Sequence, residues 1–223
     1  MKTHISPRML RIITTSLVIT TLCVGLGCAN VFSGIRYFFE GAQVEGPHNE
    51  MLKEKRVAVV CRSVSSEAFV NPDIPQRAAR ILSQQLGVKV EDIEIVNQRT
   101  VNDWVDNNMY SDFLEVGRAV DADYVLGVDI ENFTIHASSS TTLYQGQAGV
   151  HYEVIDCTTG ETLVSDAIPQ VVYPKSAPMQ ASEMNSYQFG EQFLGVLCFQ
   201  LGKNFYPYNP QDEFAFTPDV INR

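Results

Sequence analysis

Two histidines are the residues of this chain best suited to acid–base or metal chemistry. His136 closes one predicted strand and His151 lies in the next, so their imidazoles would face each other across two neighbouring strands. Imidazole titrates near neutral pH and is the commonest protein metal ligand. Two ligands alone make a poor metal site, and a polar cross-strand pair is an ordinary feature of sheets. We therefore expect no metal and no cofactor, and keep an enzyme or metal-binding protein centred on His136 and His151 as an alternative.

Carboxylates gather around the same predicted strand, at Asp121, Asp123, Asp129 and Glu131. Paired carboxylates serve glycosidases and spaced ones hold calcium, but the calcium-loop pattern is missing here. The motifs G-x-S-x-G, H-E-x-x-H and G-x-G-x-x-G and the P-loop are also absent from the sequence. Solvated charge is the favoured interpretation, and we assign no catalytic residue.

Three cysteines, Cys61, Cys157 and Cys198, lie far apart in the body of the sequence and form no C-x-x-C, which argues against zinc. Their apolar neighbours favour buried thiols. An oxidising compartment would also allow two of them to form a disulfide, so both interpretations stay open.

Aromatic residues recur in the C-terminal tail, at Tyr206, Tyr208, Phe214 and Phe216. Aromatic side chains are enriched at protein interfaces, and they also cover small cores from outside. We take these four as candidate partner-binding residues, with packing against the chain's own core as the alternative.

The N-terminus has the three-part layout of an export signal. Lys2, Arg8 and Arg11 precede an apolar core that runs from Ile12 to Gly27, and small residues follow. This core is shorter than the roughly 20 residues that a spanning helix needs. The pattern predicts a signal peptide over residues 1–27.

Gly27-Cys28 resembles the lipobox of bacterial lipoproteins, whose cysteine is acylated and becomes the mature N-terminus. That family usually has Leu three residues before the cysteine, and Gly25 stands there in this chain. The resemblance implies lipidation of Cys28 with several chains, which stable membrane attachment requires. Two alternatives remain: ordinary secretion, and an uncleaved anchor, because residues 12–35 carry no charge and are long enough to span.

The net charge of the chain limits which partners it can bind, and its length limits how many domains it can form. The full chain has 223 residues and a formal net charge of −10, and removal of Lys2, Arg8 and Arg11 with the signal would make it −13. Such an acidic protein is a poor binder of nucleic acid or of anionic lipid surfaces. About 196 residues would remain, enough for one domain with appendages. Residues 28–54 are predicted as a tether, 55–203 as a domain and 204–223 as an aromatic, Pro-containing tail.

The elements of the domain follow from its hydrophobic periods. Strands are predicted over 56–61, 92–98 and 123–136, helices over 71–87, 99–108, 111–123 and 186–205, a polar loop over 137–147, a hairpin over 148–168 and irregular chain over 169–180. We expect Asp73 to cap the first helix and Gly87 to end it, and Thr100 with Asp103 to form a capping box in the second. This order predicts an α/β fold: a mixed sheet with helices packed on it, including a late antiparallel hairpin and a C-terminal helix.

Two segments, VGRAVDADYVLGVDIENFTI and YEVIDCTTGETLVSD, resemble parts of a group of envelope α/β domains. The group includes the curli-export lipoproteins, the N-terminal domain of TolB and the lipoprotein activators of penicillin-binding proteins, and the resemblance covers about residues 55–203. It implies a non-catalytic, periplasm-facing domain of the bacterial envelope that docks to other envelope proteins. The curli exporters cross the membrane with hairpins, but residues 132–149 are too polar for such strands. We therefore expect a lipid-anchored adaptor or assembly factor, with a homo-oligomeric, ring-like assembly as a further alternative.

Overall fold

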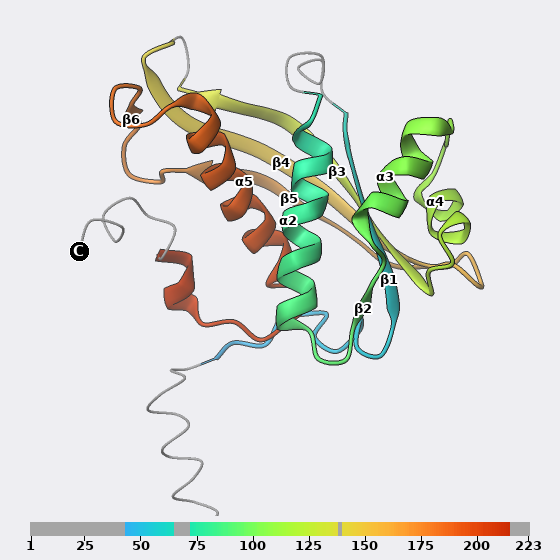
Figure 1. Cartoon of the computed structure of the whole chain (residues 1–223). Helices are drawn as coiled ribbons and strands as arrows, with labels where there is room; N and C mark the ends of the chain where they lie inside the picture. The colour runs from blue at the N-terminus through green and yellow to red at the C-terminus, as the bar shows by residue number, and fades with distance from the viewer. Residues whose placement is uncertain (1–42, 65–71, 138–139, 215–223) are drawn as a thin grey trace, which may run out of the picture. The chain divides into compact units, whose positions relative to one another are not determined.

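The computed structural model describes residues 43–64, 72–137 and 140–214, with the side chains of residues 213 and 214 excepted. The chain divides into two units, Met1–Gln43 and Val44–Arg223, and all described elements belong to the second (Figure 1). Its strands are β1 (Arg56–Ser63), β2 (Glu94–Ile95), β3 (Tyr124–His136), β4 (Leu143–Asp156), β5 (Thr162–Tyr173) and β6 (Met179–Gln180). Its helices are α2 (Ile74–Lys89), α3 (Gln98–Asn107), α4 (Phe113–Ala119), α5 (Ser186–Gly202) and the 3-10 turn η2 (Pro210–Phe214).

The strands form one mixed sheet in the order β2-β1-β3-β4-β5, with β6 paired to β4 beyond the end of β5. β1 is parallel to β2 and β3, because helices return the chain to the same end of the sheet each time. β3, β4 and β5 follow one another as antiparallel neighbours. The predicted fold class, a mixed sheet with packed helices, a late hairpin and a C-terminal helix, is confirmed.

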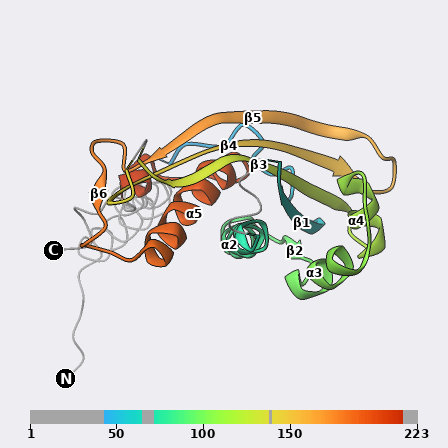
Figure 2. The same ribbon diagram turned by 90° about the horizontal axis from the view of Figure 1, so that it is seen from above.

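Alternate residues of the central strands build two cores on opposite faces of the sheet. Val57 and Val59 of β1 belong to the larger core, beneath α2 and α5, whereas Ala58 and Val60 belong to the smaller one beneath α3 and α4. Figure 2 shows α2 and α5 on the inner side of the curled sheet. On the outer side, α4 packs against the end of β4 at Ile155, and no described helix is drawn over β5. The outer side of β5 is therefore open to solvent or to a partner.

The helix ends differ in detail from the sequence patterns. Asp73 stands at the N-cap of α2 but makes no capping hydrogen bond with its side chain, and α2 continues past Gly87 to Lys89. Asn97, not Thr100, caps α3 by accepting from the backbone N–H of Arg99 at 2.9 Å. The expected capping box is therefore wrong.

The sheet is longer than predicted. The expected loop 137–147 contains the first five residues of β4, and the expected irregular segment 169–180 contains the end of β5 and all of β6. Among the helices of the described ranges, none combines the length and apolar character needed to cross a bilayer. The segment considered above as an uncleaved anchor lies outside those ranges.

Residues 44–54 pack on the body rather than hanging free of it. Val44 and Tyr208 exchange two backbone hydrogen bonds of 2.8 and 2.9 Å. The backbone N–H of His48 donates to the carbonyl of Asn204 at 2.8 Å, and Leu52 is fully buried in the larger core. Most of the predicted tether lies outside the described residues, so the proposed division of the chain stays a prediction.

Candidate functional site

The strand register separates the two histidines. His136 pairs with Tyr144 and His151 pairs with Asp129, so the expectation that they face each other is wrong. The imidazole of His136 lies 5.4 Å from the Tyr144 ring, centroid to centroid. In the ranges that the structure describes, no group of three His, Cys, Asp or Glu side chains is placed to hold a metal ion.

His151 instead contacts a serine on the neighbouring strand. Its Nε2 lies 3.3 Å from the Ser165 hydroxyl, the contact that a nucleophile and its base would make. The carboxylate opposite, Asp129, is held by Arg62 through hydrogen bonds of 2.5 and 3.1 Å. Since Arg62 occupies both carboxylate oxygens, Asp129 is not arranged as the orienting third member of a triad.

The four acidic residues do not form one centre. Asp123 accepts the backbone N–H of Arg56 at 2.8 Å and fixes the start of β1, while Asp129 holds Arg62 at its far end. The backbone carbonyl of Asp121 accepts from the Arg56 guanidinium at 2.9 Å. Glu131 is exposed on the outer side of the sheet. Solvated charge therefore describes Glu131, whereas Asp123 and Asp129 serve the fold.

The three cysteines are free thiols. Cys157 and Cys198 are buried, and the Cys198 thiol donates to the carbonyl of Ala78 at 3.5 Å. Burial raises the pKa of Cys157 to about 11 and that of Cys198 to about 12. Burial also raises the pKa of Cys61 well above its usual value. Thiols that hold their protons this strongly are poor nucleophiles.

The candidate aromatics of the tail lie in different surroundings. Tyr206 is only 1% exposed, and burial raises its pKa to about 12. Its ring is therefore a core residue here, as the self-packing alternative expects. Tyr208 is partly exposed and lies between the Phe199 ring and the Lys203 ammonium. Phe216 and the side chain of Phe214 lie outside the described residues, so their role in partner binding stays a prediction.

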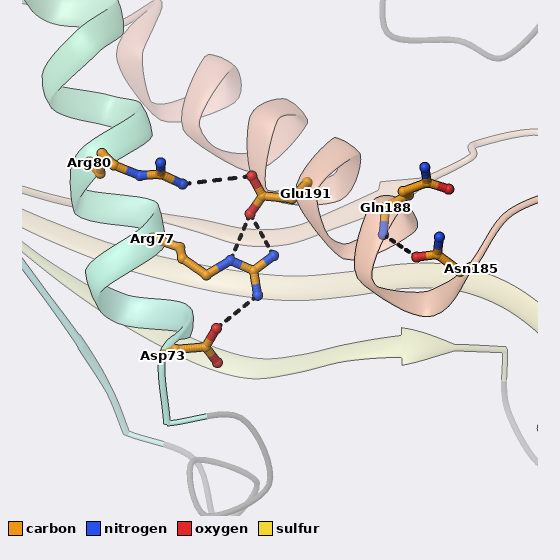
Figure 3. A network of polar contacts seen from close by, with 6 residues as sticks. All are labelled: Asp73, Arg77, Arg80, Asn185, Gln188 and Glu191. Atoms are coloured by element: carbon orange, nitrogen blue, oxygen red, sulfur yellow. Dashed lines mark hydrogen bonds and ion pairs between the residues drawn. The ribbon is translucent and has the colours of Figure 1, made fainter.

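A polar network joins the N-terminal halves of α2 and α5 (Figure 3). The Arg77 guanidinium donates to Glu191 at 2.6 Å and to Asp73 at 3.0 Å, and Arg80 approaches Glu191 at 3.7 Å. Burial alone would lower the pKa of Arg77, but the hydrogen bonds to Glu191 and Asp73 outweigh it and raise the pKa. Two arginines thus face two carboxylates, and the charges of the network are paired internally.

An exposed tyrosine covers this network. Tyr187, in the first turn of α5, has its ring 4.6 Å from the guanidinium carbon of Arg77 and is nevertheless 62% exposed. The two carboxylates orient Arg77, and its guanidinium makes a cation–π contact with the ring. The molecule thereby presents a large aromatic surface beside an ion-paired arginine.

Two hollows flank Arg77. One, of about 210 Å³, lies where α2 and α5 begin and β3 ends, with Ile74, Phe133 and Ile135 among its lining residues. The other, of about 440 Å³, lies between α2 and α3 and is lined by polar side chains, including Arg80 and Arg99. It sits outside the carboxyl ends of β1 and β2, where open α/β sheets commonly place their sites.

This end of the molecule is opposite to the docked segment 44–54 (Figure 1). The Lys53 ammonium binds Glu91, just beyond the C-terminal end of α2, at 2.8 Å, and His48 binds Asn204, just beyond α5. Tyr187 and Arg77 lie at the N-terminal ends of the same helices. Helices of 16 and 17 residues separate the two ends by about 24 Å.

Sequence reasoning missed Arg77 and Glu191, because a contact between residues 114 positions apart leaves no local pattern. Tyr187 did carry a signal. It is an aromatic residue in an apolar helix, yet it lies off the inward face formed by Phe189, Phe193 and Leu197.

Neither the family models nor the curated proteins compared with this chain give a match. Solved structures similar to it include a PelC dodecamer from Paraburkholderia phytofirmans, at 18% identity and a TM-score of 0.42 over 74% of this chain and 96% of that one. Lipoprotein GNA1162 from Neisseria meningitidis has 13% identity and a TM-score of 0.41, over 66% of this chain and 96% of that one. The LpoB C-terminal domain from Salmonella enterica has 14% identity and a TM-score of 0.37, over 56% of this chain and 87% of that one. Because these identities and TM-scores are low, the function must be argued from the chain's own residues.

Proposed function

We propose that this chain is a lipid-anchored protein of the bacterial cell envelope, facing the periplasm, that binds another envelope protein as a non-catalytic adaptor or assembly factor. Cys28 carries the lipid in this proposal, and the surface around Tyr187 carries the partner. A wholly polar surface would offer a partner little binding energy, whereas an exposed aromatic side chain offers more.

The observation that carries the proposal is the exposed Tyr187 ring over the guanidinium of Arg77, whose side chain is 15% exposed. Tyrosine and arginine are enriched among the residues that contribute most to protein interfaces. Arg77 needs no partner to satisfy its charge, because Asp73 and Glu191 already do so. The contacts within the fold therefore give no reason for the Tyr187 ring to be exposed to solvent.

The position of this surface fits a membrane anchor at the other end. The described chain enters the body at Val44, near the C-terminal ends of α2 and α5. A lipid on Cys28 would be attached through Val44, at the end of the body remote from Tyr187, and would leave the surface around Tyr187 free to meet proteins of the envelope. Docking to protein rather than to lipid also agrees with the net charge of −10.

Site-specific photocrosslinking in cells tests the proposal. A benzophenone amino acid replaces Tyr187 in the full chain, and in a control it replaces Val88, which is 83% exposed near the C-terminal end of α2. We expect a discrete protein adduct from position 187 and none of that mass from position 88. Equal adducts from both positions, or no adduct from 187, would overturn the proposed binding surface.

The ring-like alternative is separated by the same experiment. A subunit of a ring would give adducts at multiples of its own mass, and light scattering of the detergent-solubilised protein would show a large oligomer. An adduct of different mass, together with a monomeric protein in solution, supports the adaptor.

A further inference from the structure

We propose that the Asp166 carboxylate blocks the free edge of β5 and so prevents this edge from pairing with β5 of a second copy of the chain. β5 is the last strand of the sheet, and no described element pairs with its other side (Figure 2). The edge strand at the opposite side, β2, has two residues, whereas β5 has twelve. A free edge of this length presents backbone N–H and C=O groups to other chains. This inference does not rest on the proposed function.

The register of the sheet determines which amides of β5 face the free edge. The backbone N–H of Asp156 donates to the carbonyl of Glu161 at 2.9 Å, so the backbone of Asp156 in β4 faces β5. This part of β4 pairs with β3 without a register shift, and alternate residues of a regular strand form their backbone hydrogen bonds on the same side. Tyr152 therefore also faces β5, where its partner is Asp166. The next residue, Ala167, directs its N–H and C=O away from β4, toward the free edge.

The Asp166 side chain occupies the donor at this position. Its Oδ1 accepts the backbone N–H of Ala167 at 2.7 Å. Its Oδ2 accepts the hydroxyl of Tyr152, a residue of the larger core, at 3.4 Å. The phenol thus helps to orient the carboxylate toward the edge. The N–H that an added strand would use already has a charged acceptor, which makes the stronger kind of hydrogen bond.

An added strand would have to displace this contact. It would bring its own backbone carbonyl to the Ala167 N–H, so the carboxylate would lose that hydrogen bond. Asp166 and Ala167 are both exposed, so the carboxylate would also lose water. Covering a carboxylate without a new partner costs free energy. The contact therefore disfavours strand addition at this edge.

The rest of β5 explains why a single carboxylate has this effect. Register shifts interrupt its pairing with β4 on both sides of residues 164–168, and Pro169 has no N–H to donate. Residues 164–168 are therefore the regular part of the edge, and Ala167 lies within it. Bulges, proline and charge are the features with which natural sheets prevent edge-to-edge pairing.

A second copy is the occupant that the unblocked edge fits. Asp166 is the only charged residue between Glu161 and Lys175. Without it, β5 is an uncharged strand rich in valine and other apolar residues, the kind of segment that pairs with itself. Two such strands can pair antiparallel around a two-fold axis, with the same residues on both sides of the interface.

The oligomeric state of an Asp166→Ala variant tests the proposal. Sedimentation and light scattering compare the detergent-solubilised full chain with its Asp166→Ala and Glu131→Ala variants over a range of concentrations. Glu131→Ala is the matched control, because it removes the same charge from an exposed position on β3, which lies between β1 and β4. We expect the Kd for self-association to be lower by about tenfold or more in Asp166→Ala. It should be unchanged in Glu131→Ala.

A second substitution identifies the edge that is used. Ala167→Pro, added to Asp166→Ala, removes the N–H that the first substitution frees, and edge strands tolerate proline where the N–H faces away from the sheet. We expect the double variant to associate no more than the unchanged chain. The proposal is overturned if the double variant still associates, or if Asp166→Ala associates no more than Glu131→Ala.

Amide hydrogen exchange needs no variant and tests the contact in the unchanged chain. Ser165 and Ala167 both face the free edge, and the carboxylate accepts from Ala167. We expect the protection factor of the Ala167 amide to exceed that of the Ser165 amide by about tenfold or more. Equal protection of the two amides would show that the carboxylate does not hold this donor, and would overturn the proposal even if Asp166→Ala failed to fold.

Discussion

At the scale of single residues, close packing makes specific predictions about glycine. A Cβ on Gly127 in β3 would lie 2.1 Å from the Phe113 ring, whereas one on Gly87 in α2 would meet only Ile95, at 3.5 Å. We expect Gly127→Ala to destabilise the protein by about 1–3 kcal/mol through overpacking. Gly87→Ala should stabilise it by about 0.5–1 kcal/mol, since alanine is the better helix former. Urea unfolding measures both, and a stabilised Gly127→Ala would show that the Phe113 ring moves freely.

The raised pKa values of buried thiol and phenol groups predict how the free energy of unfolding changes at alkaline pH. Cys198 has an ordinary pKa of 9.0 and a folded pKa of about 12, and Tyr152, buried and close to Asp166, rises from 10.0 to about 12. The folded state therefore binds more protons than the unfolded state above pH 9, and stability falls as pH rises through this window. Below pH 9 these groups are protonated in both the folded and the unfolded state, so their contribution to the free energy of unfolding is fully present.

Replacing Cys61, Cys157 and Cys198 with alanine should move the onset of this loss from about pH 9 to about pH 10, where the tyrosines begin to titrate. Urea unfolding at successive pH values, under reducing conditions, gives the onset. An unchanged onset in the triple variant would contradict the assignment to buried thiols.

At this scale, the sequence predicts the surroundings of a residue only where they depend on its neighbours along the chain. The burial of Cys157 and Cys198, expected from their apolar neighbours, is a local property and is confirmed. The Arg77–Glu191 pair and the separation of His136 from His151 were not expected. Both depend on which residues face each other after the chain has folded, and the register of long strands with bulges is invisible in their composition.

At the scale of elements, the β4–β5 turn has its own pH signature. The backbone N–H groups of Thr159 and Thr158 donate to Asp156 Oδ1 at 3.0 and 2.8 Å. These bonds, the one from Thr159 foremost, hold the pKa of Asp156 below its usual 3.8. The ionised Asp156 side chain contributes its full stabilisation of the folded state above pH 3.8. This stabilisation is lost as the pH falls through the pKa that Asp156 has in the folded state, which is the lower of the two.

Asp156→Asn keeps the oxygen acceptor at every pH, so its stability should fall less below pH 4 than that of the unchanged chain. Asp156→Ala removes the acceptor and should be less stable across the whole range. Thermal unfolding between pH 2 and 7 compares the three proteins. Parallel acid profiles for the unchanged chain and the Asp156→Asn variant would refute the role of the carboxylate.

The same region shows why element boundaries were harder to predict than element order. Residues 143–147 and 169–173 are strand, although the first set lies in a polar stretch and the second contains Pro169. The outer side of the sheet is uncovered there, so alternate residues need not be apolar. Pro169 is tolerated because β5 is an edge strand with an irregular register beside it. Strands 56–63 and 124–136, in contrast, are covered by helices and are recognisable from their apolar residues.

At the scale of the whole molecule, the docked segment 44–54 determines how an anchor would hold the body. Among the described residues, Val44 is the first with a backbone contact to the body, and the 16 residues from 28 to 43 could span at most about 50–60 Å. Any pull on the lipid would act on the Val44–Tyr208 pair, at the end of the body away from Tyr187. The point of attachment would thus lie away from the proposed binding surface.

This arrangement depends on Leu52, which is fully buried in the larger core. We expect Leu52→Ala to lower the free energy of unfolding by about 2–5 kcal/mol, as for other large-to-small core substitutions.

Truncated chains test the same segment. A chain that begins at residue 43 should unfold at the same urea concentration as one that begins at residue 28, whereas a chain that begins at residue 55 should unfold at a much lower urea concentration. Val44→Ala is the matched control, because its side chain is exposed and its two hydrogen bonds come from the backbone. If the chains beginning at 43 and 55 were equally stable, residues 44–54 would be a free linker, and an anchor on Cys28 would join the body at residue 55 instead of at Val44.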